Sequence, residues 1–150
     1  MKLISHRGNI NGINPLYENT PEYIDKAISL GYDVEIDVWF TDKLYLGHDF
    51  PEYNINELWL KDRSENLWVH CKNFNALSKL IDTPLKVFYH QKENHTIIGN
   101  SNIIWSHQID EANNKSIIPL LDKKTLQNWA PKHVFGVCSD YITLLENEKN

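Results

Sequence analysis

Two acidic residues stand two positions apart in an otherwise apolar stretch, Val34-Glu35-Ile36-Asp37-Val38. The β-branched residues of this stretch predict a short buried strand, along which side chains alternate between the two faces. Glu35 and Asp37 therefore share a face, about 7 Å apart at a rise of roughly 3.3 Å per residue. Two neighbouring carboxylates in an apolar setting are unfavourable without positive charge between them, so a divalent cation is the simplest partner.

Further side chains that could do chemistry end or follow other predicted strands: His6, Arg7, His48, Asp49, His70, Lys72 and His90. In α/β barrels the C-terminal ends of the strands carry the active site, so we expect these side chains to gather around the two acids. Carboxylate and imidazole groups suit a metal ion. Guanidinium and ammonium groups suit phosphoryl oxygens, and free imidazoles suit proton transfer.

The elements that must position these residues alternate along the chain. Eight strands are predicted, at 3–6, 33–38, 44–48, 67–72, 85–90, 102–106, 116–120 and 133–138. Most are separated by loops or helical segments, which favours a parallel α/β sheet and, with eight strands, a compact (β/α)8 TIM-barrel-like fold. Such barrels usually take about 250 residues, so the outer helices must be reduced or missing. On length alone, an open α/β sheet is the alternative.

The best-specified helix follows Glu18-Asn19-Thr20-Pro21-Glu22. Thr20 suits the N-cap, Pro21 the first helical position and Glu22 the positive end of the helix dipole. Gly31 is a plausible C-terminal cap. Further short helices are expected at 55–60, 73–81, 93–100, 123–129 and 141–148.

Length and composition limit the class of protein. The 150 residues indicate a single domain, 1–150, and the net charge of −5 argues against a nucleic-acid binder with a broad basic face. No apolar run approaches the length of a membrane span, and no signal peptide is evident. Cys71 and Cys138 form no CxxC motif, so the simplest expectation is two reduced thiols in a cytoplasmic protein. A disulfide between the two cysteines is the alternative.

Four short motifs occur in order within the first fifty residues: His6-Arg7-Gly8, Glu18-Asn19-Thr20, Glu35-Ile36-Asp37-Val38 and Gly47-His48-Asp49. In this order and spacing the chain resembles the glycerophosphodiester phosphodiesterases, enzymes of lipid metabolism. The segment 135–141 also resembles that family's last strand, whereas 73–133 contains no motif of the family.

The resemblance implies a barrel fold and metal-dependent hydrolysis of a glycerophosphodiester-type substrate, a small molecule. It implies that Glu35 and Asp37 bind one divalent metal ion, Mg²⁺ or Ca²⁺. His6 and His48 would form the general acid/base pair, and the sequence does not assign the two roles. Glu18 would lie close to the metal or to the glycerol-binding region, or it would serve the start of the first helix.

The resemblance also implies that Arg7 and Lys72 hold phosphate, with the alternative that Arg7 pairs with Glu18 or Glu35. The family usually has Glu-x-Lys on the fourth strand, and here the segment reads His70-Cys71-Lys72. The resemblance thus places His70 where the family has an acidic ligand, and an imidazole ligand there would favour Mn²⁺ or Zn²⁺ over harder ions.

Two other functions stay open. A barrel of the same descent could bind a phosphorylated ligand without turnover, or a phospholipase-type lyase could form a cyclic phosphate. His90 and Asp140 lie in no motif and are expected to be structural. Residues 50–66 and 91–101 are the candidate specificity loops. The sequence does not determine the oligomeric state.

Overall fold

A computed structural model describes residues 1–130 and 133–148, and these residues form one mixed sheet of ten strands. Most of the strands lie parallel to their neighbours. In spatial order these are β6 (Lys86–Phe88), β5 (Leu67–Cys71), β2 (Asp33–Phe40), β1 (Lys2–His6), β10 (Gly136–Ser139), β9 (Ser116–Pro119) and β8 (Ile103–Ser106).

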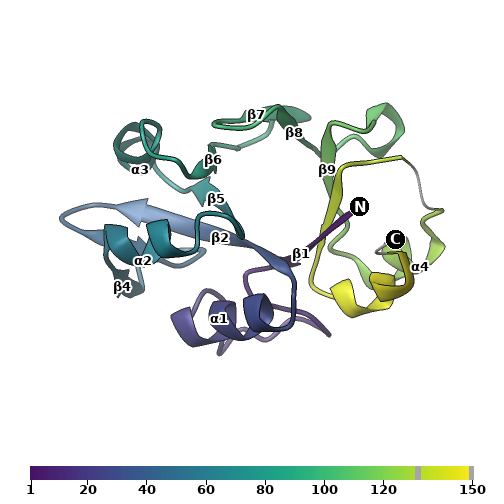
Figure 1. Cartoon of the computed structure of the whole chain (residues 1–150), viewed down its shortest axis with the longest axis horizontal. Coiled ribbons are helices and arrows are strands. Elements are labelled where there is room, and N and C mark those ends of the chain that lie inside the picture. The colour runs from purple at the N-terminus through teal and green to yellow at the C-terminus, as the bar shows by residue number, and fades with distance from the viewer. Residues whose placement is uncertain (131–132, 149–150) are drawn as a thin grey trace.

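The remaining strands are antiparallel. β3 (Leu44–Leu46) folds back on β2, and β4 (Tyr53–Ile55) pairs with β3. β7 (His95–Ile98) pairs with β8 at the other end of the sheet. A single bridge between Val87 and Gly99 links β6 to the residue after β7. The sheet therefore curves round until its ends approach each other (Figure 1).

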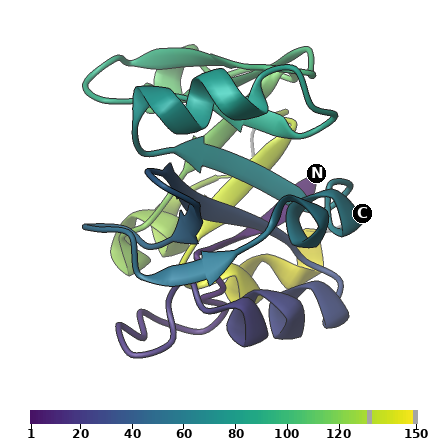
Figure 2. The same cartoon turned by 90° about the vertical axis from the view of Figure 1, so that its left-hand side faces the viewer.

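The helices are short and lie on the outer side of the curved sheet (Figure 1). They are α1 (Pro21–Ser29), α2 (Glu57–Asp62), α3 (Phe74–Leu80) and α4 (Lys123–Asn128), with 3₁₀ turns η1 (Ile109–Glu111) and η2 (Ile142–Glu148). Figure 2 shows α3, in teal, at the top and α1, in dark blue, at the bottom of the turned view. Within the described residues, none of these helices has the length and apolar character that crossing a bilayer requires.

The expectation of a (β/α)8 barrel is wrong. Each predicted strand has a counterpart, but the strand expected at 44–48 is the second arm of a hairpin and runs antiparallel to β2. The helix expected at 93–100 is replaced by β7, and only the three-residue η1 lies between β8 and β9. The chain is too short to place a helix after every strand, so the described part of it forms a mixed sheet with few helices.

The start of α1 confirms the prediction for this helix. The Thr20 hydroxyl accepts a hydrogen bond from the Tyr23 amide at 3.3 Å, and Pro21 is the first helical residue. The helix ends at Leu30, and Gly31 follows with φ of 87°, a left-handed conformation that favours glycine. α1 thereby fixes the far end of the long loop that leaves β1.

The alternation along β2 divides its side chains between the two faces of the sheet. Val34, Ile36 and Val38 are buried in one cluster with Ile24 and Ala27 of α1. Glu35 and Asp37 therefore point away from the helix, toward the concave side of the sheet. Both cysteines are free and buried, in separate clusters.

Candidate metal and phosphate site

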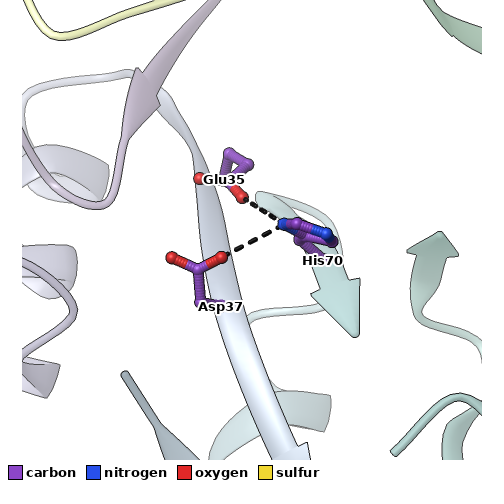
Figure 3. A group of neighbouring side chains, drawn as sticks. All are labelled: Glu35, Asp37 and His70. Carbon is purple, nitrogen blue, oxygen red and sulfur yellow. Dashed lines mark ion pairs between the residues drawn. The ribbon is translucent and has the colours of Figure 1, made fainter. Parts of the chain in front are cut away.

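The strand register brings the acids of β2 beside residues of both neighbouring strands. Glu35 lies opposite His6 of β1, and Asp37 lies opposite His70 of β5. Because β1, β2 and β5 are parallel, their C-terminal ends meet at one edge of the sheet. Figure 3 shows Glu35 and Asp37 projecting from β2 toward the His70 ring on β5.

Glu35, Asp37 and His70 offer ligand atoms that all lie within 4.8 Å of one another. His70 Nδ1 is 3.1 Å from Asp37 Oδ1 and 3.7 Å from Glu35 Oε1. The side chains of Glu35 and Asp37 are only 3% and 1% exposed. Within the described part of the chain, neither Glu35 Oε2 nor Asp37 Oδ1 accepts a hydrogen bond. Two buried carboxylate oxygens thus lack a hydrogen bond of good geometry, although His70 Nδ1 and Lys72 Nζ lie 3.1 and 3.7 Å from Asp37 Oδ1.

The contact made by His70 Nε2 determines which nitrogen of the ring is protonated. His70 Nε2 lies 3.3 Å from the carbonyl oxygen of His90. A carbonyl oxygen can only accept, so Nε2 carries the proton. In the neutral ring Nδ1 then presents a lone pair to Asp37 and Glu35. Three sets of lone pairs face one another, an arrangement that requires a cation between them, either a proton on Nδ1 or a metal ion.

These residues fit a divalent metal ion. Bonds of about 2.4 Å to one ion can join ligand atoms up to about 4.8 Å apart, and the three ligand atoms of this group lie within that distance of one another. Two carboxylates and one imidazole form a mixed oxygen and nitrogen donor set, which suits Mn²⁺ or Zn²⁺ as well as harder ions. The carbonyl contact from His90 would hold the imidazole in the ligating tautomer.

The two acids differ in their electrostatic surroundings. Burial and the neighbouring charge of Asp37 raise the pKa of Glu35. Burial also acts to raise the pKa of Asp37, but contact with His70 and the charges of Arg7 and Lys72 outweigh it and hold that pKa well below its usual range. Asp37 is therefore the fixed negative charge of the site, and Glu35 holds a proton more readily until a cation approaches.

Both predicted phosphate-binding residues lie beside Asp37. Arg7 Nε is 3.0 Å from Asp37 Oδ2, and Lys72 Nζ is 3.7 Å from Asp37 Oδ1. Arg7 has φ of 55°, and its amide donates to the Glu35 carbonyl at 2.9 Å. This left-handed residue directly follows the end of β1. Positive groups therefore stand next to the acids, where they could meet phosphoryl oxygens.

Glu18 lies outside the group of three ligands. One of its carboxylate oxygens accepts from Asn9 Nδ2 at 2.8 Å, and the other is 3.3 Å from Arg7 Nη1. In the structure Glu18 thus pairs with Arg7, one of the alternatives that the sequence left open. Glu18 is therefore a neighbour of Arg7, one of the two residues predicted to bind phosphate.

His6 has a partner that the sequence did not reveal. His6 Nδ1 donates to Asp140 Oδ1 at 2.8 Å, and the same oxygen accepts from Asn9 Nδ2 at 2.7 Å. His6 Nε2 is 3.8 Å from Glu35 Oε2. Burial acts to lower the pKa of His6, but the hydrogen bond to Asp140 and the charges of Glu35 and Asp140 outweigh it and raise the pKa. Asp140, expected to be structural, thus orients His6.

His48 differs from His6 in its exposure and in the direction of its pKa shift. Its Nδ1 donates to Asp49 Oδ1 at 2.8 Å, and its side chain is 43% exposed. Partial burial and the positive charge of Arg7 lower the pKa of His48. The hydrogen bond to Asp49 leaves Nε2 as the unprotonated nitrogen of the neutral ring. The two histidines therefore differ in protonation, with His6 holding its proton more firmly.

Asn19 is a further residue whose importance the sequence did not show. Its Nδ2 donates to Asp37 Oδ2 at 2.9 Å, and its Oδ1 accepts from the Asp37 amide at 3.1 Å. Asn19 is buried and has φ of 60°, which asparagine tolerates better than most residues. The position of Asn19 in the Glu-Asn-Thr motif was the only sequence signal for this contact.

Two cavities, each of about 140 Å³, share Arg7 and His48 as a common wall. One, the polar cavity, is lined otherwise by Pro15, Glu18, Asn19, Asp49, Phe50 and Glu52. The other, the ring-lined cavity, also contains His6, Glu35 and His70. Its outer part is formed by Phe88, His90, Trp105, His107, Pro119 and Leu121. The candidate site thus opens in two directions from one pair of residues.

Comparisons with protein-family models, with curated proteins and with solved structures found no match to this chain.

Proposed function

We propose that this protein is a metal-dependent phosphodiesterase that hydrolyses a small-molecule diester of the glycerophosphodiester type. The observation that carries the proposal is the convergence of Glu35, Asp37 and His70, with two buried carboxylate oxygens that lack a hydrogen bond of good geometry, next to Arg7. Phosphodiester cleavage requires charge neutralisation at phosphate and proton transfer at two oxygens, and this group of residues offers both.

Glu35, Asp37 and His70 would hold one divalent ion, which when bound supplies charge neutralisation at the phosphate. The presence of His70 in place of a third acid leaves Mn²⁺ and Zn²⁺ as candidates beside Mg²⁺ and Ca²⁺. Arg7 and Lys72 would then exchange part of their contact with Asp37 for contact with the phosphoryl oxygens. Their charge would stabilise the negative charge that grows there in the transition state.

The surroundings of the two histidines support a division of roles. His6, buried and paired with Asp140, would be the general acid and would donate its Nε2 proton to the leaving alcohol. His48, whose pKa is lowered, would be the general base and would accept a proton from water at Nε2. Pairs of titratable groups with pKa values pushed apart are typical of acid/base pairs.

A hydrolysis assay on glycerophosphodiesters, with EDTA and then with Mg²⁺, Ca²⁺, Mn²⁺ and Zn²⁺ in turn, tests the proposal. We expect activity that EDTA abolishes, and a loss of at least about 10²-fold in His6→Ala and in His48→Ala. His95→Ala, which removes a histidine outside both cavities, is the matched control and should keep full activity. Absence of turnover with every metal would reject the enzyme and leave a protein that binds a phosphorylated ligand.

A cytoplasmic location forms part of the same proposal, supported by two free cysteines. Cell fractionation with a tagged full-length chain would test it.

A further inference from the structure

The ring-lined cavity has an outer part that the proposed chemistry does not use. Its walls come from the C-terminal ends of β6, β8 and β9, on the side of the site away from Glu18. Phe88 and Trp105 stack with ring centroids 4.7 Å apart and an interplanar angle of 21°. His90 and His107 stack at 4.1 Å, also at 21°. Planar rings therefore dominate this wall.

The rings carry little charge. Burial and the neighbouring His90 lower the pKa of His107 to about 4, so that His107 is neutral at pH 7. Pro119 and Leu121 complete the wall with apolar atoms. No carboxylate lines the outer part of this cavity among the described residues, whereas Glu18, Asp49 and Glu52 line the polar cavity. The polar cavity thus suits a group that carries hydroxyls, whereas the outer part of the ring-lined cavity suits an apolar group.

The size of the ring-lined cavity limits its occupant. An apolar cavity of about 150 Å³ in another protein accommodates benzene, and this cavity measures about 140 Å³. Because this volume includes the inner part beside Glu35 and His70, the outer part takes at most one flat six-membered ring, which would extend the stacks already present. The hydrogen-bonding side-chain groups of this wall are the ring nitrogens of His90, Trp105 and His107, which lie in the planes of their rings.

We infer that the ring-lined cavity binds the leaving alcohol of an unsymmetrical phosphodiester, and that this alcohol is compact, apolar and planar. The inference rests on the proposed function. His6, whose Nδ1 donates to Asp140 and whose Nε2 lies 3.8 Å from Glu35 Oε2, lines the ring-lined cavity but not the polar one, whereas His48 lines both. The leaving alcohol, which receives the His6 proton, therefore occupies the ring-lined cavity. The polar alcohol that stays bonded to phosphorus occupies the polar cavity.

The proposed reaction is the hydrolysis of one ester bond of the phosphodiester. A water oxygen forms the new bond to phosphorus while the bond between phosphorus and the leaving alcohol's oxygen breaks. One water proton passes to His48, and the His6 proton passes to the departing oxygen. With a benzyl ester of glycerol phosphate, the products are benzyl alcohol and glycerol phosphate, and benzyl phosphate with free glycerol is not formed.

The test compares the benzyl and ethyl diesters of glycerol phosphate with the metal-loaded protein. Benzyl alcohol and ethanol are similarly poor leaving groups, so a difference in rate reports the binding of the ring. We expect kcat/KM to be at least about tenfold higher for the benzyl diester, because the ring leaves water for an apolar wall. Calorimetry should show the same preference for benzylphosphonate over ethylphosphonate, independently of turnover.

Leu121→Trp should fill the ring-lined cavity from a position that is 37% exposed and should bring the benzyl-to-ethyl ratio close to one. Leu58→Trp, at an exposed position on α2 outside both cavities, is the matched control and should keep the preference. A ratio near one in the unmodified protein, or free glycerol as product, overturns this inference and leaves the proposed function intact. No turnover of either diester, together with no activity on glycerophosphodiesters, overturns both.

Discussion

Replacing Asp140 by Asn tests the division of roles between the histidines. The exchange keeps the shape of the side chain and an oxygen that can accept from His6 Nδ1 and Asn9 Nδ2, which lie 2.8 and 2.7 Å from Asp140 Oδ1. It removes the negative charge beside a ring that is only 11% exposed. The main loss is therefore the charge-assisted part of the hydrogen bond to His6.

The size of the effect follows from that contact. Hydrogen bonds to charged groups contribute about 1.5–3 kcal/mol, which corresponds to a loss of about 10- to 150-fold in kcat if His6 acts as the acid. The direction of the pH effect is also fixed. Asp140 helps to raise the pKa of His6, so its removal lowers that pKa. A general acid must be protonated, and the alkaline limb of the kcat profile should therefore move to lower pH.

The assay is the pH dependence of kcat on a glycerophosphodiester with saturating metal, measured for the unmodified protein and for Asp140→Asn. Asp33→Asn is the matched control. Asp33 is also a buried acid, but it accepts from Lys2, Asn66 and Trp68 at the opposite end of β2. An unchanged alkaline limb in Asp140→Asn, or an equal loss of kcat in Asp33→Asn, would refute the assignment of His6 as an acid oriented by Asp140.

Further predictions concern the metal ligands and their support. His70→Glu should shift the preference of activity toward Mg²⁺ or Ca²⁺, since it supplies a third anionic ligand; an unchanged metal profile would show that His70 is no ligand. Asn19→Ala removes two hydrogen bonds to Asp37 and should weaken metal affinity by about 10- to 100-fold, measured by calorimetry, and an unaltered affinity would count against its role. Metal at a hundred times its Kd should stabilise the fold by about 2.7 kcal/mol, or roughly 5–10 °C in Tm. Glu35→Gln should abolish this increase, and a persistent increase would place the ion elsewhere.

The sequence predicted the elements that are specified locally. The alternation in 34–38 placed two acids on one face of a strand because burial of Val34, Ile36 and Val38 fixes which face is inside. The cap at Thr20 is likewise a local interaction, between residues three apart. The candidate site residues of β1, β2 and β5 could be gathered into one hypothesis because these parallel strands end at a common edge. His48 follows the antiparallel strand β3, so this rule does not account for its position.

The rest depends on long-range pairing that periodicity does not encode. The four residues His95–Ile98 form a strand through pairing with β8, yet so short a run is equally compatible with a helical turn. The direction of β3 is fixed by its hairpin with β2, which removed one of the expected parallel strands. The contact between His6 and Asp140 joins residues 134 positions apart, and only the pairing of β1 with β10 brings them together.

The central claim is that Glu35, Asp37 and His70 bind a divalent ion. Calorimetric titration of the EDTA-treated protein with Mn²⁺ tests it most directly, with Asp37→Asn as the variant and Asp33→Asn as the control. The structure predicts one ion per chain, an affinity at least about 100-fold weaker in Asp37→Asn, and no change in Asp33→Asn. Absence of saturable binding, or equal affinity in Asp37→Asn and the unmodified protein, would contradict the claim.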